Sequence, residues 1–277
     1  MKPAFLGAGI LLLACLGCGG EETPREAAVV DSGEVTASGG PTTPTNVPES
    51  QIEVERVILE LEKVIEKGQW DEKSAKIRQL AQYGPDARAA IPLLRSLVAG
   101  DLDEHWLVRS EAVCALAAIG PEALAELAVG LKVRDGRVRR AAAYALGKVG
   151  SGSDEVIAVL RDARRDIVWQ VRAEAVRSLA SHGAKAVPEI REALRDQDRR
   201  VRMAAAWSLR QLGPQAKSAM PDLRAALEDE DWLVRSAATY ALGRMGRGAA
   251  ADLAAMAKDE NWAVRWAADQ ARQEAGL

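Results

Sequence analysis

The sequence is poor in residues that build reactive and metal-binding sites. Its 277 residues include three cysteines, two histidines and one phenylalanine, and aromatic residues make up 4% of the chain. Outside the N-terminal segment the one cysteine is Cys114, which we interpret as an apolar side chain in a helix core. His105 and His182 have no partner ligands near them in sequence. The sequence therefore predicts no metal site and no bound cofactor.

Catalytic motifs are also missing. The chain has no glycine-rich loop ending in Lys-Ser or Lys-Thr, no Gly-x-Ser-x-Gly turn, and no Cys-x-x-Cys pair in the part expected to fold. Cys15 and Cys18 have this spacing but belong to the N-terminal signal described below. We therefore expect no catalysis and no small-molecule substrate.

Charge is low overall but unevenly placed. The net charge is −3, of which residues 1–69 contribute −6 and the remaining 208 residues +3. A nucleic-acid-binding protein usually carries a concentrated basic face, which so nearly neutral a body does not provide. The sequence therefore argues against a nucleic-acid partner.

The N-terminus has the pattern of an export signal. Lys2 precedes an apolar run from Ala4 to Gly17, which is shorter than the roughly 20 residues that span a bilayer. Small residues precede Cys15 and Cys18, and the segment resembles a bacterial lipoprotein signal. We expect residues 1–18 to be this signal, with Cys18 or Cys15 lipidated and the chain anchored in the cell envelope, periplasmic or surface-exposed. An ordinary cleaved secretory signal is the alternative.

Residues 19–49 are rich in Gly, Glu, Thr, Pro and Ser and predict a disordered tether. Ser50 and Glu53 then form a capping-box pattern ahead of apolar residues with helical spacing. These are Ile52, Val57, Ile58, Leu61, Val64 and Ile65. We expect residues 50–69 to be a helix that caps the first unit of the array that follows.

A repeat organises residues 70–277. Six Val-Arg dipeptides form a series with their arginines 30 or 33 residues apart, and most of these copies have a leucine seven residues later. The arginines are Arg109, Arg139, Arg172, Arg202, Arg235 and Arg265. A glycine stands where the first helix of each unit must end. This period predicts stacked helical hairpins that bury their apolar faces against one another.

The unit from Asp229 to Gly243 resembles the HEAT family, in particular the short HEAT-like repeats named for phycobilisome lyases. The resemblance covers about residues 70–277, with a degenerate first copy that has Lys73 in place of the arginine. It implies an all-α fold: a right-handed α-solenoid of about seven two-helix HEAT-like repeats with an N-terminal capping helix, together residues 50–277.

Acidic residues recur six positions before the arginine, at Asp103, Asp166, Asp196, Asp229 and Asp259. We predict that they cap the first helix or pair with an arginine of the same or a neighbouring repeat, which would form a structural ladder. A row of arginines that binds an anionic ligand is the alternative. Acidic residues early in the second helix are explained by the helix dipole, and an acidic stripe that faces a basic partner is the alternative. They are Glu126, Glu155, Glu189, Asp222 and Asp252.

Five of the seven tryptophans occupy one slot, three residues before the arginine or its equivalent. They are Trp70, Trp106, Trp169, Trp232 and Trp262. Helical geometry points this slot away from the buried stripe, so the row is a candidate partner-binding surface. Packing between repeats is the alternative, because the copies with Gly136 and Arg199 in the slot carry Tyr144 and Trp207 eight residues later.

Together these features predict a lipid-anchored envelope scaffold that mediates protein–protein interactions, with an unknown protein partner and a membrane contact through the lipid. The resemblance leaves two alternatives: an enzyme or accessory of the bilin-lyase type, and a binder of envelope polysaccharide through the tryptophan row. Deoxyhypusine hydroxylases, another HEAT-like family, hold a di-iron centre with His-Glu pairs, and this sequence has none. Bilin lyases work in the cytoplasm, whereas this chain begins with an export signal.

Overall fold

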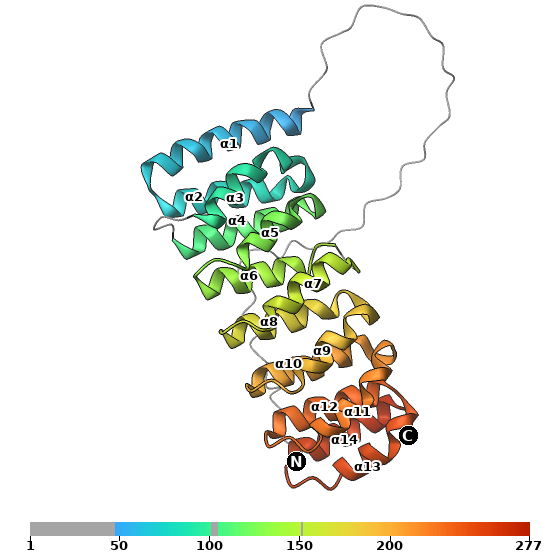
Figure 1. The fold of residues 1–277 in the computed structure, drawn as a ribbon. Coiled ribbons are helices and arrows are strands. Elements are labelled where there is room, and N and C mark those ends of the chain that lie inside the picture. Colours follow the sequence, from blue (N-terminus) through green and yellow to red (C-terminus); the bar gives the residue numbers. More distant parts are fainter. Residues whose placement is uncertain (1–47, 101–104, 151) are drawn as a thin grey trace, which may run out of the picture. The chain divides into compact units, whose positions relative to one another are not determined.

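The computed structural model describes residues 48–277 except 101–104 and 151, and the described residues contain helices and no strand (Figure 1). The signal, both lipidation candidates, most of the tether and Asp103 lie outside the described residues. No helix in the described part of the chain is long and apolar enough to cross a membrane.

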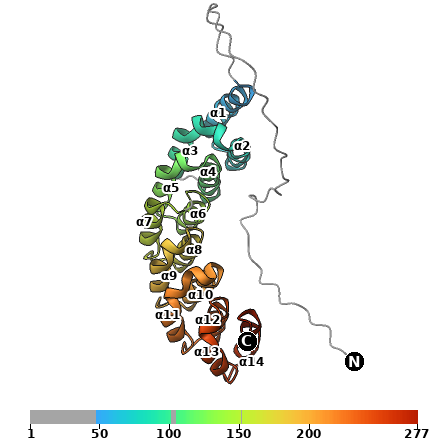
Figure 2. The ribbon, with the colours of Figure 1, turned by 90° about the vertical axis from the view of Figure 1, so that its right-hand side faces the viewer.

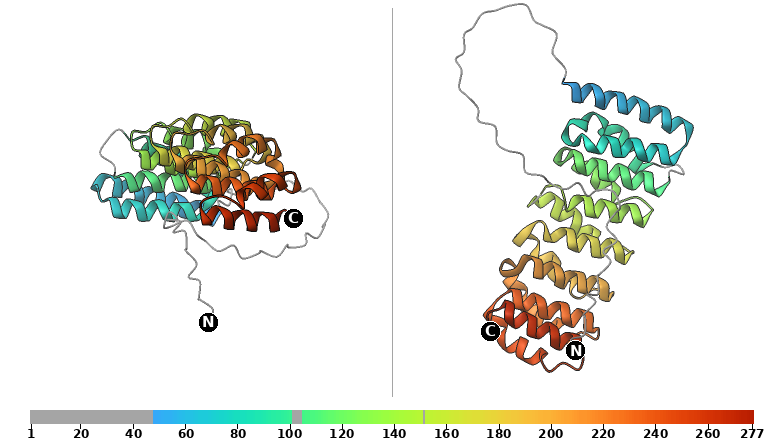
Figure 3. Two further views of the ribbon diagram at one scale, coloured as in Figure 1. Left: turned by 90° about the horizontal axis from the view of Figure 1, so that it is seen from below. Right: turned by 180° about the vertical axis from the view of Figure 1, so that it is seen from behind.

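Helices follow one another along the array in pairs (Figures 1 and 3). The pairs are α2 (Trp70–Gln82) with α3 (Ile91–Ala99), α4 (Trp106–Ile119) with α5 (Leu124–Gly130), α6 (Gly136–Leu146) with α7 (Asp154–Ala163), α8 (Trp169–Ala180) with α9 (Val187–Ala193), α10 (Arg199–Leu212) with α11 (Met220–Ala226), and α12 (Trp232–Arg244) with α13 (Ala250–Met256). The last copy consists of α14 (Trp262–Glu274) alone. The predicted all-α solenoid of about seven copies is confirmed, with the difference that the seventh copy is described as a single helix.

The even-numbered helices from α2 to α14 pack side by side as one layer, and the odd-numbered helices from α3 to α13 form the other (Figure 2). The valine before each repeat arginine is fully buried, as is the leucine seven residues after that arginine wherever it occurs. Alanines fill the space between these side chains, which lets neighbouring helices approach closely. The spacing of Val, Arg and Leu thus places the arginine at the edge of the core.

The first helix, α1 (Glu49–Lys67), covers α2 with Val54, Val57, Leu61 and Val64. It differs from the expected capping helix at its start, because the chain enters it from Pro48 and no side chain caps it. Proline fits a helix start because it has no amide hydrogen to leave unpaired. The capping-box prediction is wrong: Ser50 lies inside the helix and Glu53 pairs with Arg56 at 2.5 Å.

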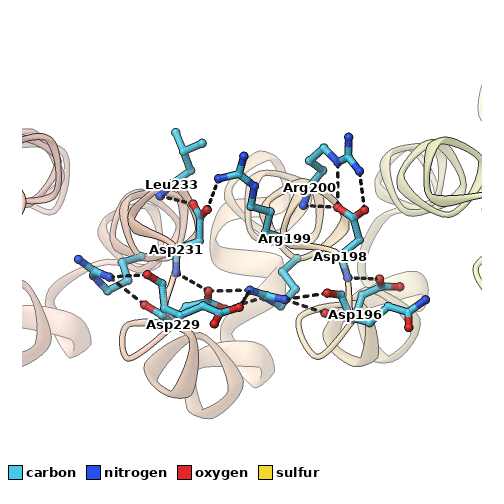
Figure 4. Close-up of polar contacts among 11 residues, drawn as sticks. Asp196, Asp198, Arg199, Arg200, Asp229, Asp231 and Leu233 are labelled. Atoms are coloured by element: carbon cyan, nitrogen blue, oxygen red, sulfur yellow. Dashed lines mark hydrogen bonds and ion pairs between the residues drawn. The ribbon is translucent and has the colours of Figure 1, made fainter.

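Four of the repeat arginines join their own repeat to the next through a carboxylate. Arg202 donates from Nε and Nη2 to Asp229 at 2.7 and 2.9 Å, and from Nη1 to the carbonyl of Asp196 at 3.0 Å (Figure 4). The same two-pronged pairing joins Arg139 to Asp166, Arg172 to Asp196, and Arg235 to Asp259. These side chains are 7–11% exposed. Each arginine is therefore held by a carbonyl of its own loop and a carboxylate of the following loop.

The ladder aspartates do not cap the helices. In each, Oδ1 accepts a hydrogen bond from the backbone N–H two residues on, as Asp196 does from Asp198 at 2.8 Å. Helix capping is done by the residue four positions before the arginine, at His105, Asp135, Asp198, Asp231 and Asn261. The sequence does carry a signal for these caps, an Asp or Asn directly before the first helix in four copies. The predicted caps were therefore placed two residues too early.

Arg109 and Arg265 bind differently. Val133 stands where the ladder aspartate of the third repeat would be, and Arg109 donates to the carbonyl of Val98 at 2.7 and 3.1 Å instead. Arg265 donates to the carbonyls of Asp259 and Glu260, both at 2.8 Å. Where the carboxylate partner is missing among the described residues, both arginines bind backbone carbonyls: Arg109 binds that of Val98 at the end of α3, and Arg265 binds those of the loop before α14.

A second set of ion pairs joins the second helices. Glu189 pairs with Arg161 at 2.7 Å, Asp222 with Arg191 at 2.6 Å and Asp252 with Arg224 at 2.9 Å. Three of the acidic residues that we attributed to the helix dipole therefore also link consecutive repeats. These arginines are 38–47% exposed, so each pair contributes less than the buried ladder does.

Arg202→Ala is expected to lower the free energy of unfolding by about 3 kcal/mol, because it leaves the carboxylate of Asp229 buried without its partner. Urea denaturation followed by circular dichroism measures this change. The matched control is Arg177→Ala, which removes an exposed pair with Glu174 and is expected to cost less than about 1 kcal/mol. Equal stability of Arg202→Ala and the unchanged protein, with loss of an anionic ligand, would make the arginines a binding row instead.

His182 is buried and joins the fourth repeat to the third. Its Nδ1 accepts a hydrogen bond from the N–H of Gly152 at 3.1 Å. Burial lowers the pKa of His182 below its usual 6.5. Below pH 6.5 the unfolded chain therefore binds a proton that the folded chain does not, and stability falls as the pH falls toward the lowered pKa.

In His182→Asn, the loss of stability between pH 7 and the lowered pKa is expected to shrink, because the amide can accept from Gly152 but does not titrate. Denaturation midpoints across this pH range measure the slope. His105→Asn is the control, since asparagine also caps a helix and the first histidine is exposed. Identical slopes in His182→Asn and the unchanged protein would contradict the prediction.

Candidate binding surface

The five tryptophans of the row each occupy the first position of a first-layer helix, at the N-termini of α2, α4, α8, α12 and α14. The residue directly before the tryptophan caps the helix in the copies with Trp106, Trp232 and Trp262, whereas no side chain caps the helices of Trp70 and Trp169. In the copies with Trp169, Trp232 and Trp262, the loop before the tryptophan also carries a ladder aspartate. The row does not have a uniform environment along the array.

Two indoles of the row are covered by arginines of the next repeat. The guanidinium of Arg137 lies 4.5 Å from the ring centre of Trp106, and that of Arg200 lies 3.5 Å from the ring centre of Trp169. Both arginines stand 31 residues after their tryptophan. Each is held by a capping aspartate, Arg200 by Asp198 at 2.7 and 2.9 Å (Figure 4). Packing between repeats therefore accounts for these two tryptophans.

The capping aspartates that hold these arginines are themselves stabilised as anions. The hydrogen bonds from Arg200 lower the pKa of Asp198 to about 2, and those from Arg137 lower the pKa of Asp135. An aspartate whose pKa is depressed in the folded chain contributes stability above its usual pKa of 3.8, which is lost as the pH falls toward 2. The covered part of the row is therefore charged and ordered at neutral pH.

The other three indoles are open to solvent. Trp70 is 48% exposed, Trp232 40% and Trp262 71%. The position of the next repeat that holds arginine after Trp106 and Trp169 holds Leu107 after Trp70 and Ala263 after Trp232. The ring of His105 lies 4.9 Å from that of Trp70 and covers part of it. These three tryptophans are the part of the row available to a partner.

The two copies without tryptophan use the slot for other contacts. Arg199 forms an ion pair with the capping Asp231 of the next repeat (Figure 4). Gly136 packs against Val168, which a side chain at this position would approach within 3.1 Å. Tyr144 and Trp207 lie away from the slot, because eight residues along a helix is more than two turns. Trp207 packs on Tyr240 of the adjacent repeat, which agrees with the hypothesis of packing between repeats.

Trp207 instead belongs to an aromatic cluster that the repeat pattern does not predict. Its ring stacks on that of Tyr240 at 5.6 Å, and Tyr240 meets Trp266 edge-on at 6.3 Å. Trp207 and Tyr240 share a slot five residues after the repeat arginine, whereas Trp266 comes one residue after it. Trp266 meets the other two rings because the three side chains come from three adjacent helices, and the repeat spacing gives no sign that Trp266 joins them.

Cys114 is only partly buried, which corrects the interpretation of a fully buried core side chain. In the described part of the chain no group of three or more His, Cys, Asp or Glu residues is placed to hold a metal ion. The features with a defined geometry for recognition are therefore the open tryptophans of the row and the aromatic cluster.

In iodide quenching, the tryptophan fluorescence should show an accessible and an inaccessible fraction. Trp262→Phe is expected to reduce the accessible fraction, because its indole is the most open of the row. Trp169→Phe should leave the quenchable emission unchanged and lower only the protected emission, and Arg200→Ala should raise the quenchable emission by uncovering Trp169. Fluorescence that is uniformly protected from iodide would contradict the open row and assign all of these indoles to packing.

The comparisons with known proteins agree with this architecture. No curated protein matches the sequence. Kap121p shares 14% identity at a TM-score of 0.59 over 83% of this chain and 30% of its own. The complex of CpcE and CpcF of phycocyanin lyase from Nostoc sp. PCC7120 shares 22% identity at a TM-score of 0.47 over 89% of this chain and 93% of that one.

Human deoxyhypusine hydroxylase shares 24% identity at a TM-score of 0.40 over 82% of this chain and 97% of its own. At these identities the similarity concerns the fold. The family model for HEAT repeats matches residues 103–180, 164–241 and 213–272. These matches cover more than half of the sequence, and the chain belongs to the HEAT-repeat family.

Proposed function

We propose that this protein is a lipid-anchored scaffold of the bacterial cell envelope, which binds a partner protein through the open part of its tryptophan row. The observation that carries the proposal is the exposure of Trp70, Trp232 and Trp262, which is between 40 and 71%. Most other large apolar side chains of the array are buried. Tryptophan is enriched at the energetic centres of protein interfaces. The HEAT-repeat fold supports the scaffold role, because such arrays offer long surfaces for protein contacts.

The proposed anchor rests on the N-terminal sequence. Cys18 or Cys15 follows an apolar run with small residues before the thiol, and about 30 polar residues separate the thiol from the array. Two or more acyl chains give stable membrane binding where one gives only reversible binding. The scaffold would thus be held in the periplasm or at the cell surface, within reach of envelope proteins.

The open row also supports one alternative function, binding of envelope polysaccharide, because exposed indoles offer apolar faces to sugar rings as well. A bilin-lyase-type role rests on the family resemblance alone, and no observation on the described residues favours it. Binding of a protein and binding of a polysaccharide predict that different molecules are captured from the envelope.

The test is crosslinking in intact membranes followed by affinity purification of the full chain. In the row variant, Trp70, Trp232 and Trp262 are all changed to Ala. A discrete crosslinked protein is expected with the unchanged chain and is expected to be lost, by at least tenfold, with the row variant. The matched control changes Tyr144, an exposed aromatic residue outside the row, to Ala and should keep the partner.

Circular dichroism and thermal unfolding establish that the row variant is folded, which we expect because its three side chains are open. A partner retained by the folded row variant would overturn the role of the row, and capture of glycan in place of protein would favour the alternative.

Metabolic labelling with palmitate tests the anchor. If a variant with both Cys15 and Cys18 changed to Ser still incorporates the label and stays in the membrane, lipidation at these thiols is refuted.

A further inference from the structure

A second surface lies on the first layer of helices, where α10, α12 and α14 run side by side. The aromatic–arginine patch consists of Trp207, Arg210 and Gln211 on α10, Tyr240 and Arg244 on α12, and Trp266 on α14. Trp207, Arg210, Gln211 and Arg244 line an open hollow of about 520 Å³. Trp266 is 55% exposed beside the aromatic stack.

The patch is held in one arrangement by a contact that spans three repeats. The guanidinium of Arg210 lies 5.1 Å from the ring centre of Trp207 and 5.0 Å from that of Tyr240. Its Nη2 donates to Glu274 of α14 at 2.8 Å, 64 residues further along the chain. A platform held in this way loses little conformational freedom when a ligand binds, which favours affinity.

Close packing of α12 on α14 contributes to this arrangement. A side chain at Gly243 would lie 2.6 Å from the Cβ of Ala271, so only glycine fits at this position without a shift. Glu274 lies on the same helix as Ala271, and α14 therefore stays near enough to α12 for Arg210 to reach it. The patch is a product of the packing of these three helices.

The charges of the patch indicate the kind of ligand. Glu274 neutralises Arg210, whose Nε is buried and has no acceptor among the described residues. Arg244 is exposed at the rim of the hollow, and no hydrogen bond or ion pair engages its side chain in the described part of the chain. A guanidinium in this state binds a carboxylate through two parallel hydrogen bonds, and Gln211 beside it offers a planar amide. A basic ligand would instead be repelled.

The spacing of the rings favours an extended polypeptide. Neighbouring ring centres of the stack lie 5.6 and 6.3 Å apart. Alternate residues of an extended chain lie about 6.6 Å apart and point to the same side. Apolar side chains at alternate positions of such a segment match the rings, and an acidic residue next to them matches Arg244.

We propose that the aromatic–arginine patch binds an extended, acidic peptide segment of a partner protein, with apolar side chains on Trp207, Tyr240 and Trp266 and a carboxylate on Arg244. This assignment rests on the scaffold function proposed above and names the chemistry of one partner. Trp, Tyr and Arg are the residue types that dominate binding energy at protein interfaces. Trp262 of the row lies one helical turn before Trp266, so the two surfaces adjoin on α14.

The test is selection of a random heptapeptide display library on the full chain, followed by fluorescence anisotropy with a labelled synthetic copy of the enriched peptide. Enriched peptides are expected to carry Asp or Glu beside apolar residues at alternate positions. Trp266→Ala and Arg244→Glu should each raise the Kd at least tenfold. Selection on the Arg244→Glu variant should enrich Lys or Arg in place of the acidic residue.

The matched control is Arg140→Glu, which reverses the charge of an exposed arginine on α6, in the same layer but outside the patch, and should leave the Kd unchanged. Trp266→Ala should unfold at the same temperature as the unchanged chain because its indole is open. Enrichment without acidic residues, or a Kd unaffected by both patch variants, would overturn the proposal, as would binding of oligosaccharides in place of peptides.

The outcomes separate this inference from the proposed function. A crosslinked partner lost with the row variant, without any peptide that depends on Arg244, would refute the patch and leave the membrane scaffold standing. A selected peptide that depends on Arg244 and Trp266, with no partner found in membranes, would support the patch and refute the scaffold at the membrane.

Discussion

The paired arginine and aspartate between neighbouring repeats is the interaction on which the rest of this structure depends. Each pair is 7–11% exposed, so its charges are largely removed from water, and two parallel hydrogen bonds offset that cost. The same arginine also binds carbonyls of its own loop. One side chain therefore orders two consecutive loops, and these loops set the start of every first-layer helix from α8 to α14.

Because of this arrangement, the exposure of side chains on one repeat depends on residues of the next repeat. An indole of the row is covered when the next repeat supplies arginine two positions before its own ladder arginine, as Arg137 and Arg200 do. Where that position holds leucine or alanine, the indole stays open. Because solenoid repeats contact chiefly their neighbours, single substitutions can open or close one position of the row without altering the others.

The repeat period was sufficient to predict the helical pairs, the buried valine and leucine, and the acidic partners as candidates for the arginines. The period could not show whether each aspartate pairs with the arginine of its own repeat or with the arginine of the preceding repeat. In a regular array the aspartate lies at a fixed distance from both. Exposure of Trp106 and Trp169 was equally undetermined, since it depends on a cation from another repeat. The cluster of Trp207, Tyr240 and Trp266 was missed because Trp266 occupies a different slot from the other two and meets them only through packing.

Irregularities in the repeat are thus the positions where function is best sought. A residue that recurs in nearly every copy, such as the ladder arginine, is explained by the contact that those copies share. Trp266 and Arg244 have no such explanation: the equivalent positions in other copies hold residues as different as Ala173 and Ser181. Their exposed aromatic and cationic groups add nothing to the ladder, and α14 brings Trp266 within one turn of the open Trp262. The last three first-layer helices therefore combine open indoles of the row with an exposed aromatic and cationic patch, and recognition of a partner has both surfaces to use there.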